Sequence, residues 1–365
     1  MISIIVPTYN ERNNVTKVAK AIKWALRDHE YEIIFVDDST DETEEILQQM
    51  AQANPRIRCE HRANNRGLGA AVLRGFELAR GDVVAVMDAD MQHPPEMLLP
   101  MFAQIQAGHD VVIPSRFIPG GSDGGLSLPR KVISGIARTM AKAALKRVRL
   151  SSDPTSGYFM FRRDVIEGIS LRPIGWKILI EILARGHYAR VAEIPYAFAP
   201  RATGQSKMSL KEQWNFTRHL AHLVAESPDD RRIYVFACVG ISGVLLNSLV
   251  YILLVTLGLP PETSGFLSAL AAMISNFALN DGVTWRESHG REAWLTRACK
   301  YALASGVGVV LDVGVLSALV RVLDANLILA NLVGIGAATA WNFAASSLWV
   351  WKKRARMVSG VREIP

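Results

Sequence analysis

The stretch Val83-Val84-Ala85-Val86-Met87-Asp88-Ala89-Asp90 decides the fold of the first part of the chain. Its apolar residues form a run that is typical of a strand buried on both faces of a sheet. Asp88 and Asp90 point to the same face of an extended chain, so their carboxylates converge beyond the end of the strand. Carboxylate oxygens are ligands for hard divalent cations, which commonly bind diphosphates. The stretch therefore predicts a cation and diphosphate site at the edge of a sheet.

Apolar runs and helical patterns alternate on both sides of this stretch. Strand-like runs cover residues 2–6, 32–36, 57–61 and 110–114, and helical spacing covers residues 11–26, 41–51 and 67–79. This alternation predicts an α/β fold with a mostly parallel, Rossmann-like sheet between helices. Ligands in such sheets bind beyond the carboxyl ends of the strands. Asn10-Glu11 and Asp37-Asp38 follow two of the strands and are expected at the same edge as Asp88 and Asp90.

Four long apolar segments follow residue 232, at 233–257, 263–280, 301–320 and 325–351. About 20 apolar residues cross a bilayer as a helix, so the pattern predicts four transmembrane helices. The connections on one side carry the basic residues Arg231, Arg232, Arg286, Arg291, Arg297, Lys300 and Lys352–Arg354. The positive-inside rule then predicts that both termini and the first domain face the cytoplasm. The net charge of +7 and its position beside apolar segments indicate a bilayer partner and no nucleic acid.

The apolar segments repeat a pattern. Asn276-Phe277 recurs as Asn342-Phe343 and Trp285 recurs as Trp351, each 66 residues later. The repeat predicts two helical hairpins of duplicated design. Asp312 lies inside the third segment, where a carboxyl group is costly, so it is either a functional residue or a carboxyl that is hydrogen-bonded within the bundle.

Residues 126–150 interleave basic with apolar side chains. The basic ones are Lys131, Arg138, Lys142, Lys146, Arg147 and Arg149. This pattern favours an amphipathic helix at the level of the lipid headgroups, with an ordinary surface helix as the alternative. Residues 210–224 are a second candidate of the same kind just before the apolar segments.

Six motifs occur in order along the first part of the chain. They are residues 6–11 (VPTYNE), 36–39 (VDDS), 88–96 (DADMQHPPE), 115–117 (SRF), 153–159 (DPTSGYF) and 204–207 (GQSK). With these motifs the sequence resembles polyprenol-phosphate glycosyltransferases of glycosyltransferase family 2, closest to the dolichol-phosphate mannose synthases. The later segments resemble a GtrA-type four-helix membrane module. The resemblance implies a GT-A catalytic domain at 1–230, a transmembrane domain at 231–352 and a basic tail at 353–365.

The resemblance also implies roles for individual residues. Asp88, Asp90 and Gln92 would hold Mg²⁺ or Mn²⁺. Pro7, Tyr9, Glu11, Val36, Asp38 and Ala89 would line the site of the nucleotide sugar. Arg116, Arg130 and Ser134 would face the lipid phosphate, while Arg201 and Lys207 would close over the donor diphosphate. Asp90, Arg116 and Arg130 are the expected catalytic residues, whereas Asp37 is expected to cap the end of the sheet.

The implied reaction is the inverting transfer of mannose from GDP-mannose to a polyprenyl (dolichyl) phosphate. The acceptor is already an anion near neutral pH, so the reaction needs cationic groups more than a strong base. A glucosyltransferase that uses UDP-glucose and undecaprenyl or dolichyl phosphate is the alternative. A protein of another class, a lipid-sugar translocator or scaffold that only binds nucleotide, is disfavoured by the intact set of metal ligands. The sequence leaves homo-oligomerisation open.

Overall fold

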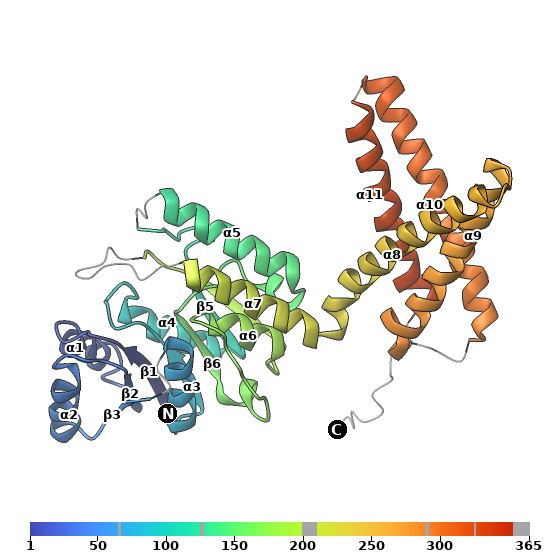
Figure 1. The fold of residues 1–365 in the computed structure, drawn as a ribbon. Coiled ribbons are helices and arrows are strands. Elements are labelled where there is room, and N and C mark those ends of the chain that lie inside the picture. The colour runs from blue at the N-terminus through green and yellow to red at the C-terminus, as the bar shows by residue number, and fades with distance from the viewer. Residues whose placement is uncertain (65–66, 125–127, 199–209, 289–291, 325, 353–365) are drawn as a thin grey trace, which may run out of the picture. The chain divides into compact units, whose positions relative to one another are not determined.

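The structure is a computed structural model that describes residues 1–64, 67–124, 128–198, 210–288, 292–324 and 326–352 (Figure 1). The chain divides into two compact units, Met1–Ser227 and Pro228–Pro365. The first contains all the named strands of the described chain, and the second contains helices that are long and apolar enough to cross a membrane.

The first unit is built on a seven-stranded sheet with the order β3-β2-β1-β4-β6-β5-β7. The strands are β1 (Ile2–Thr8), β2 (Tyr31–Asp37), β3 (Ile57–His61), β4 (Val83–Val86), β5 (Val111–Ser115), β6 (Phe159–Arg162) and β7 (Val191–Pro195). The first four strands pair in parallel, and only β6 runs antiparallel, between β4 and β5. The mostly parallel sheet predicted from the alternating pattern is thereby confirmed.

Helices cover both faces of this sheet. One face packs against α1 (Val15–Ala25), α2 (Thr43–Ala53) and α4 (Leu98–Gln106). The other packs against α3 (Leu68–Leu78), α5 (Leu128–Ala144), α6 (Ile178–Arg185) and α7 (Leu210–Glu226). β1, β2 and β4 are buried along their whole length because both of their faces are covered. Their carboxyl ends therefore form one rim where the chain reaches solvent.

The chain turns sharply where two of these strands end. Asn10, shortly after β1, and Met91, shortly after β4, have positive φ angles of 58° and 62°. This left-handed conformation is uncommon for residues other than glycine and ends an extended run abruptly. Both turns lie at the predicted ligand edge, where the motifs that follow β1 and β4 leave the sheet.

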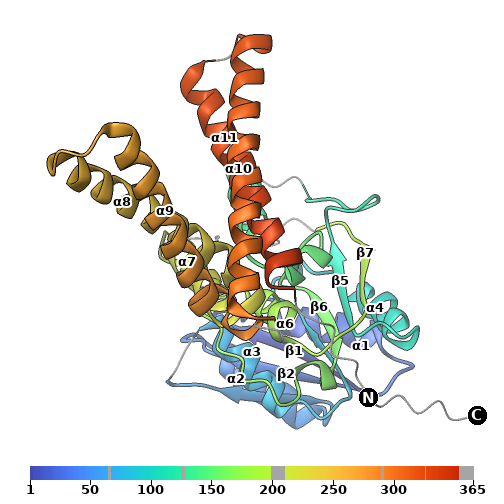
Figure 2. The ribbon, with the colours of Figure 1, turned by 90° about the vertical axis from the view of Figure 1, so that its right-hand side faces the viewer.

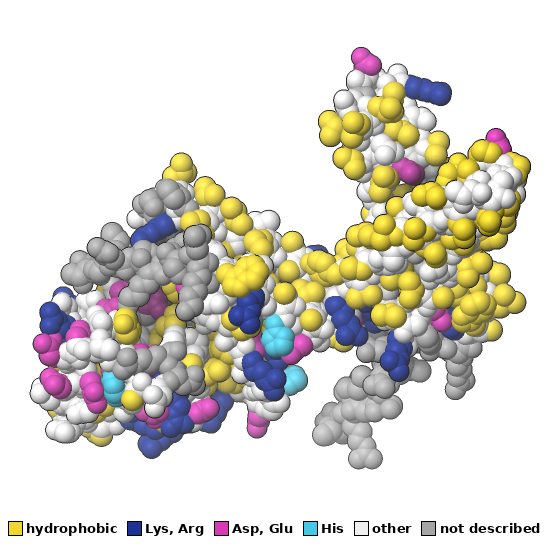
Figure 3. All heavy atoms as spheres, in the orientation of Figure 1, with side chains coloured by type: hydrophobic (Ala, Val, Ile, Leu, Met, Phe, Trp, Pro, Cys, Tyr) yellow, Lys and Arg dark blue, Asp and Glu magenta, His cyan; other side chains and the backbone are white. Residues whose placement is uncertain are grey.

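The second unit consists of two helical hairpins. The helices are α8 (Pro228–Thr256), α9 (Pro261–Leu279), α10 (Trp294–Leu323) and α11 (Leu327–Ala345). α9 and α11 each continue into a π-helical turn, Asn280–Thr284 and Ser346–Val350. Figures 1 and 2 show α8 with α9 and α10 with α11 side by side, and the two hairpins diverge toward their loop ends. Apolar side chains cover most of the visible surface of this unit (Figure 3).

The hairpins meet in an aromatic cluster in which the repeated residues contact one another. The buried rings of Trp285 and Trp351 stack with centroids 4.5 Å apart and planes 6° apart. Each indole also contacts the phenylalanine of the other repeat, Trp285 with Phe343 and Trp351 with Phe277. The 66-residue repeat of the sequence thus corresponds to equivalent contacts across one junction.

A buried ion pair lies beside this cluster. Arg297 donates from Nε and Nη2 to the two oxygens of Asp281, at 2.8 and 3.0 Å, and from Nη1 to the carbonyl of Glu292. The indole nitrogen of Trp351 also donates to Asp281, at 2.8 Å. Arg297 and Lys300 were expected in a basic connection, but both lie within α10, and Arg297 is buried. Arg297 therefore joins the two hairpins and is not a surface charge.

Candidate active site

The ends of β1, β2 and β4 place several predicted residues side by side. Pro7 of β1 is paired with Val36 of β2, and the next pair is Thr8 with Asp37. Pro7 and Val36 are buried near the carboxyl ends of their strands, and the residues after them lie at the edge of the sheet. Ala89 is also buried, between the two predicted metal-binding carboxylates. The three neighbouring strands thus bring together the motifs that the sequence separates.

The segment after β4 folds the predicted metal-binding residues into one turn. The amide of Gln92 donates to Asp90 Oδ1 at 3.1 Å, across the positive-φ residue Met91. The side chains of Asp90 and Gln92 are buried, and that of Asp88 is 42 % exposed. Asp88 therefore lies at the mouth of the site, with Asp90 and Gln92 beneath it.

The donor chemistry of these three residues suits a hard divalent cation. Two carboxylates and one amide offer only oxygen ligands, the type that Mg²⁺ and Mn²⁺ prefer. Within the described residues, no three His, Cys, Asp or Glu side chains gather as a metal site, so the amide oxygen of Gln92 would be the third protein ligand beside the two carboxylates. Asp88, Asp90 and Gln92 fit the predicted cation by chemical type.

His93 packs against this turn and holds it in place. Its Nδ1 accepts a hydrogen bond from the Asp88 amide at 3.1 Å, and its ring stacks on Tyr158 with centroids 5.0 Å apart. Burial lowers the pKa of His93 to about 4; the charges of Asp90 and Asp153 oppose this shift, and those of Arg116 and Lys177 add to it. His93 is therefore neutral near neutral pH, consistent with its acceptor role. It orders the loop without adding a positive charge.

Arg116, at the end of β5, is fixed by a fully buried carboxylate. Its Nε and Nη2 both donate to Asp153 Oδ2, at 2.9 and 2.8 Å. Asp153 belongs to the DPTSGYF motif, and Thr155 donates to its other oxygen at 3.2 Å. The guanidinium also lies over the ring of Phe198, 5.1 Å from its centroid. Two motifs that are far apart in the sequence are thus joined by one ion pair.

Lys177 is a further site residue that sequence reasoning missed. Its Nζ donates to the carbonyl of Thr155 at 2.7 Å, on the same motif that holds Arg116. Burial lowers the pKa of Lys177, and the charges of Asp153 and Asp88 oppose that shift. The lysine therefore places a cation near both the metal-binding turn and the arginine. A single lysine before a short helix has no sequence pattern that would have marked it.

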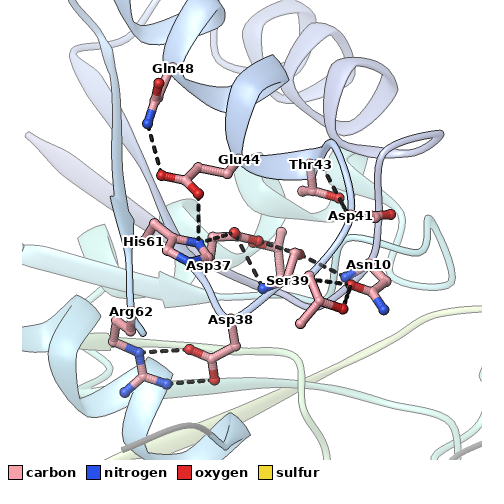
Figure 4. Close-up of polar contacts among 12 residues, drawn as sticks. Asn10, Asp37, Asp38, Ser39, Asp41, Thr43, Glu44, Gln48, His61 and Arg62 are labelled. Carbon is pink, nitrogen blue, oxygen red and sulfur yellow. Dashed lines mark hydrogen bonds and ion pairs between the residues drawn. The ribbon is translucent and has the colours of Figure 1, made fainter. Parts of the chain in front are cut away.

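The two consecutive aspartates after β2 have different surroundings, as Figure 4 shows. Asp37 is buried and accepts hydrogen bonds from Thr8 and Ser39, with His61 Nδ1 at 2.8 Å. These contacts tie the ends of β1, β2 and β3 together. Asp38 faces the other side, where Arg62 binds both of its oxygens and the amide of Gly67 donates at 2.8 Å. Asp38 thus lies at the rim, where Arg62 and the Gly67 amide hold its carboxylate in place.

The remaining predicted residues lie on two separate elements. Tyr9 is 44 % exposed beyond β1, and the carboxylate of Glu11 accepts from Asn14 at 2.7 Å. Arg130 and Ser134 lie one turn apart on α5, where both are partly exposed. Arg201 and Lys207 lie outside the described residues, so their implied role over the diphosphate remains a prediction.

Comparison with known proteins identifies both units. Residues 3–170 match the model of glycosyl transferase family 2, and residues 235–351 match the GtrA/DPMS transmembrane domain. The second match, together with the four apolar helices, makes the chain a membrane protein. Both family resemblances are thereby confirmed.

Three similar proteins are named as transferases of mannose to a polyprenol-type phosphate. The dolichol-phosphate mannosyltransferase of Pyrococcus furiosus is 39 % identical over 335 residues, which cover 92 % of this chain and 94 % of that protein. The yeast (Saccharomyces cerevisiae) protein of the same name is 35 % identical, over 60 % of this chain and 86 % of its own length. The polyprenol monophosphomannose synthase of Mycolicibacterium smegmatis is 38 % identical, over 56 % and 80 %.

A solved structure that the chain is similar to is glucosyl-3-phosphoglycerate synthase from Mycobacterium tuberculosis. It is 21 % identical with a TM-score of 0.47, and the match covers 61 % of this chain and 78 % of that one. Because the relative from Pyrococcus matches along nearly the whole length of both proteins, the chain belongs to the dolichol-phosphate mannosyltransferase family, with a family 2 glycosyltransferase domain and a GtrA/DPMS transmembrane domain.

Proposed function

We propose that this protein transfers mannose from GDP-mannose to a polyprenyl (dolichyl) phosphate, with inversion at the anomeric carbon. The observation that carries the proposal is that the Asp88–Gln92 turn and the Arg116–Asp153 ion pair follow strands that end at the same edge of the sheet, where His93 and Lys177 lie near both groups. The relatives named as mannosyltransferases and as a polyprenol monophosphomannose synthase support the choice of sugar and acceptor.

On the donor side, Asp88, Asp90 and Gln92 would hold Mg²⁺ or Mn²⁺. A bound divalent cation offsets the charge that develops on a departing nucleotide diphosphate. Pro7, Val36 and Ala89 would form the floor beneath the nucleotide sugar, while Tyr9, Glu11 and Asp38 would line its edge.

On the acceptor side, a phosphate oxygen attacks the anomeric carbon as the bond from that carbon to the diphosphate oxygen breaks. The acceptor oxygen is already ionised, so this single displacement requires no proton transfer and inverts the configuration. The acceptor phosphate and the donor diphosphate repel each other because both are anions. Arg116, Arg130 and Ser134 would hold the acceptor phosphate in place despite this repulsion. The ion pair with Asp153 keeps the Arg116 guanidinium in a fixed orientation for this role.

The outer face of α5 supports a site at the membrane surface. Leu128, Val132, Ile136 and Met140 recur every fourth residue, and their exposed fractions range from 39 to 74 %. Exposed apolar side chains on a basic helix are typical of a helix that lies at the headgroup layer. We place this unit and both termini in the cytoplasm, on the basis of the positive residues that flank the apolar helices.

The proposal is tested with the purified full chain in detergent. The assay supplies labelled GDP-mannose or UDP-glucose, a polyprenyl phosphate and Mg²⁺ or Mn²⁺. We expect a mannolipid from GDP-mannose, no product after Asp90→Ala, and normal product formation after Asp82→Asn. Asp82 is the matched control because it precedes the same strand and its side chain is 94 % exposed. Product from UDP-glucose alone would establish the alternative donor, and nucleotide binding without turnover would favour a scaffold.

A further inference from the structure

Arg138 on α5 lies on the same helix face as two residues of the expected acceptor site. Arg130, Ser134 and Arg138 are spaced by four residues, so their side chains follow one another along the helix. All three are partly exposed, in contrast to the exposed apolar row around Val132 and Ile136. The helix therefore separates an apolar face from a face that carries two arginines and a hydroxyl group.

One aromatic ring connects Arg138 with Arg116. The Arg138 guanidinium carbon lies 3.7 Å from the centroid of the Phe117 ring, and that of Arg116 lies 5.2 Å from the same centroid. A guanidinium over a ring face is oriented without having its charge neutralised. Phe117 thus holds the end of Arg138 beside the arginine that follows β5.

The charges of these arginines are balanced differently. Arg116 is paired with the buried Asp153, so its positive charge is largely offset. Arg130 and Arg138 have no carboxylate partner among the residues that the structure describes. Lys131, between them in sequence, is paired with Asp123 at 2.9 Å. Two uncompensated guanidiniums therefore remain on the face that carries Ser134.

We infer that Arg138 binds the acceptor phosphate directly, as the third arginine of this site. The inference rests on the proposed transfer to a polyprenyl phosphate and extends the expected pair of Arg130 and Ser134. A phosphate monoester carries a charge of about −1.5 to −2 near neutral pH. Arg130 alone would leave part of that charge unbalanced, whereas Arg130 and Arg138 together match it. The same chemistry would also suit the anionic headgroup of a bilayer lipid, so the test separates these two sources.

The test compares Arg138→Gln with Lys142→Gln in the full chain, in an uncharged detergent. Lys142 is one turn further along α5, and its replacement removes the same charge from the same helix. We measure equilibrium binding of a polyprenyl phosphate without donor, and the KM for each substrate during turnover. Loss of one charge-assisted contact should raise the acceptor Kd and KM roughly tenfold or more in Arg138→Gln. The donor KM and the Lys142→Gln values should be unchanged.

Arg138→Lys keeps the charge but not the planar group, so it should recover part of the lost acceptor affinity. Equal effects of Arg138→Gln and Lys142→Gln on acceptor binding would overturn the inference, provided that both variants melt like the wild type. Binding of each variant to vesicles that contain phosphatidylglycerol is measured separately. The inference would also be overturned if Arg138→Gln weakened binding to these vesicles but not binding to the polyprenyl phosphate. If the wild type binds the acceptor but forms no product from GDP-mannose, the proposed transfer fails, and the binding comparison still decides the role of Arg138.

Discussion

Arginines have opposite roles in the two units. Arg297 of the second unit is buried, and Asp281 and a backbone carbonyl satisfy its guanidinium. Arg130 and Arg138 of the first unit are partly exposed and lack carboxylate partners within the described chain. A buried charge is tolerated only when it is paired, whereas an exposed and uncompensated charge remains able to bind an anion. The comparison therefore separates a structural arginine from candidate binding residues.

The largest loss of stability is expected when the buried Asp281–Arg297 ion pair is broken. Asp281→Ala leaves Arg297 charged and unpaired, which should lower the free energy of unfolding by about 3–5 kcal/mol. Thermal unfolding in detergent measures this change. The double variant Asp281→Leu with Arg297→Met removes both charges and should be much less destabilised. Equal losses in the single and double variants would show that the pair is not what stabilises the junction.

Arg116 is paired with a carboxylate, as Arg297 is, but it lies at the candidate active site. Arg116→Lys keeps the charge but cannot reproduce the two contacts to Asp153. The loss should be about 1.5–3 kcal/mol in transition-state stabilisation, seen as a lower kcat/KM. A variant with unchanged kcat/KM would mean that the orientation of the guanidinium does not matter for transfer.

A smaller loss of stability is expected at a close contact between α10 and α11. A Cβ added at Gly308 would overlap the side chain of Asn342, while one at Gly306 would meet nothing within 4 Å. Gly308→Ala should therefore cost about 1–3 kcal/mol through overpacking, whereas Gly306→Ala should not. The melting temperatures of the two variants test this difference. Similar melting temperatures would show that the hairpin can adjust at Gly308.

The smallest effect concerns a charge pair far from the rim. Burial alone would raise the pKa of Glu32, but hydrogen bonds from Ser3, Arg58 and the Arg80 amide outweigh it and lower the pKa below 4.5. A lowered carboxyl pKa stabilises the folded state above pH 4.5, and this contribution is lost as the pH falls below that value. Glu32→Gln should thus be less stable than the wild type near neutral pH, and the gap should narrow in acid. A gap that is constant with pH would contradict this assignment.

The sequence predicted those parts of the fold that follow from continuous patterns. β1, β2, β4, β5 and the four long apolar helices are confirmed because each contains a sustained apolar run, and β3 is confirmed although its five residues include Arg58, Glu60 and His61. β6 and β7 were not predicted, since Phe159–Arg162 is only four residues long within a motif, and Val191–Pro195 is interrupted by a polar residue. Their pairing with β5 depends on contacts between distant segments, which local patterns do not contain.

The site was predictable where a motif marked it and not where tertiary contacts built it. The turn at Asp88 to Gln92 was visible in the sequence because its residues are close together. Lys177 and the Asp281–Arg297 pair were not, because each depends on a partner brought near by folding. The positions of Arg201 and Lys207 remain predictions, because they lie outside the described residues.

Binding of Mn²⁺ together with GDP, followed by electron paramagnetic resonance, tests the central claim most directly. The wild type should show a bound Mn²⁺ signal that strengthens when GDP is added. Asp90→Ala should lose that signal, and Asp82→Asn should retain it. An unchanged, GDP-dependent signal in Asp90→Ala would contradict the assignment of the cation and diphosphate site to the end of β4.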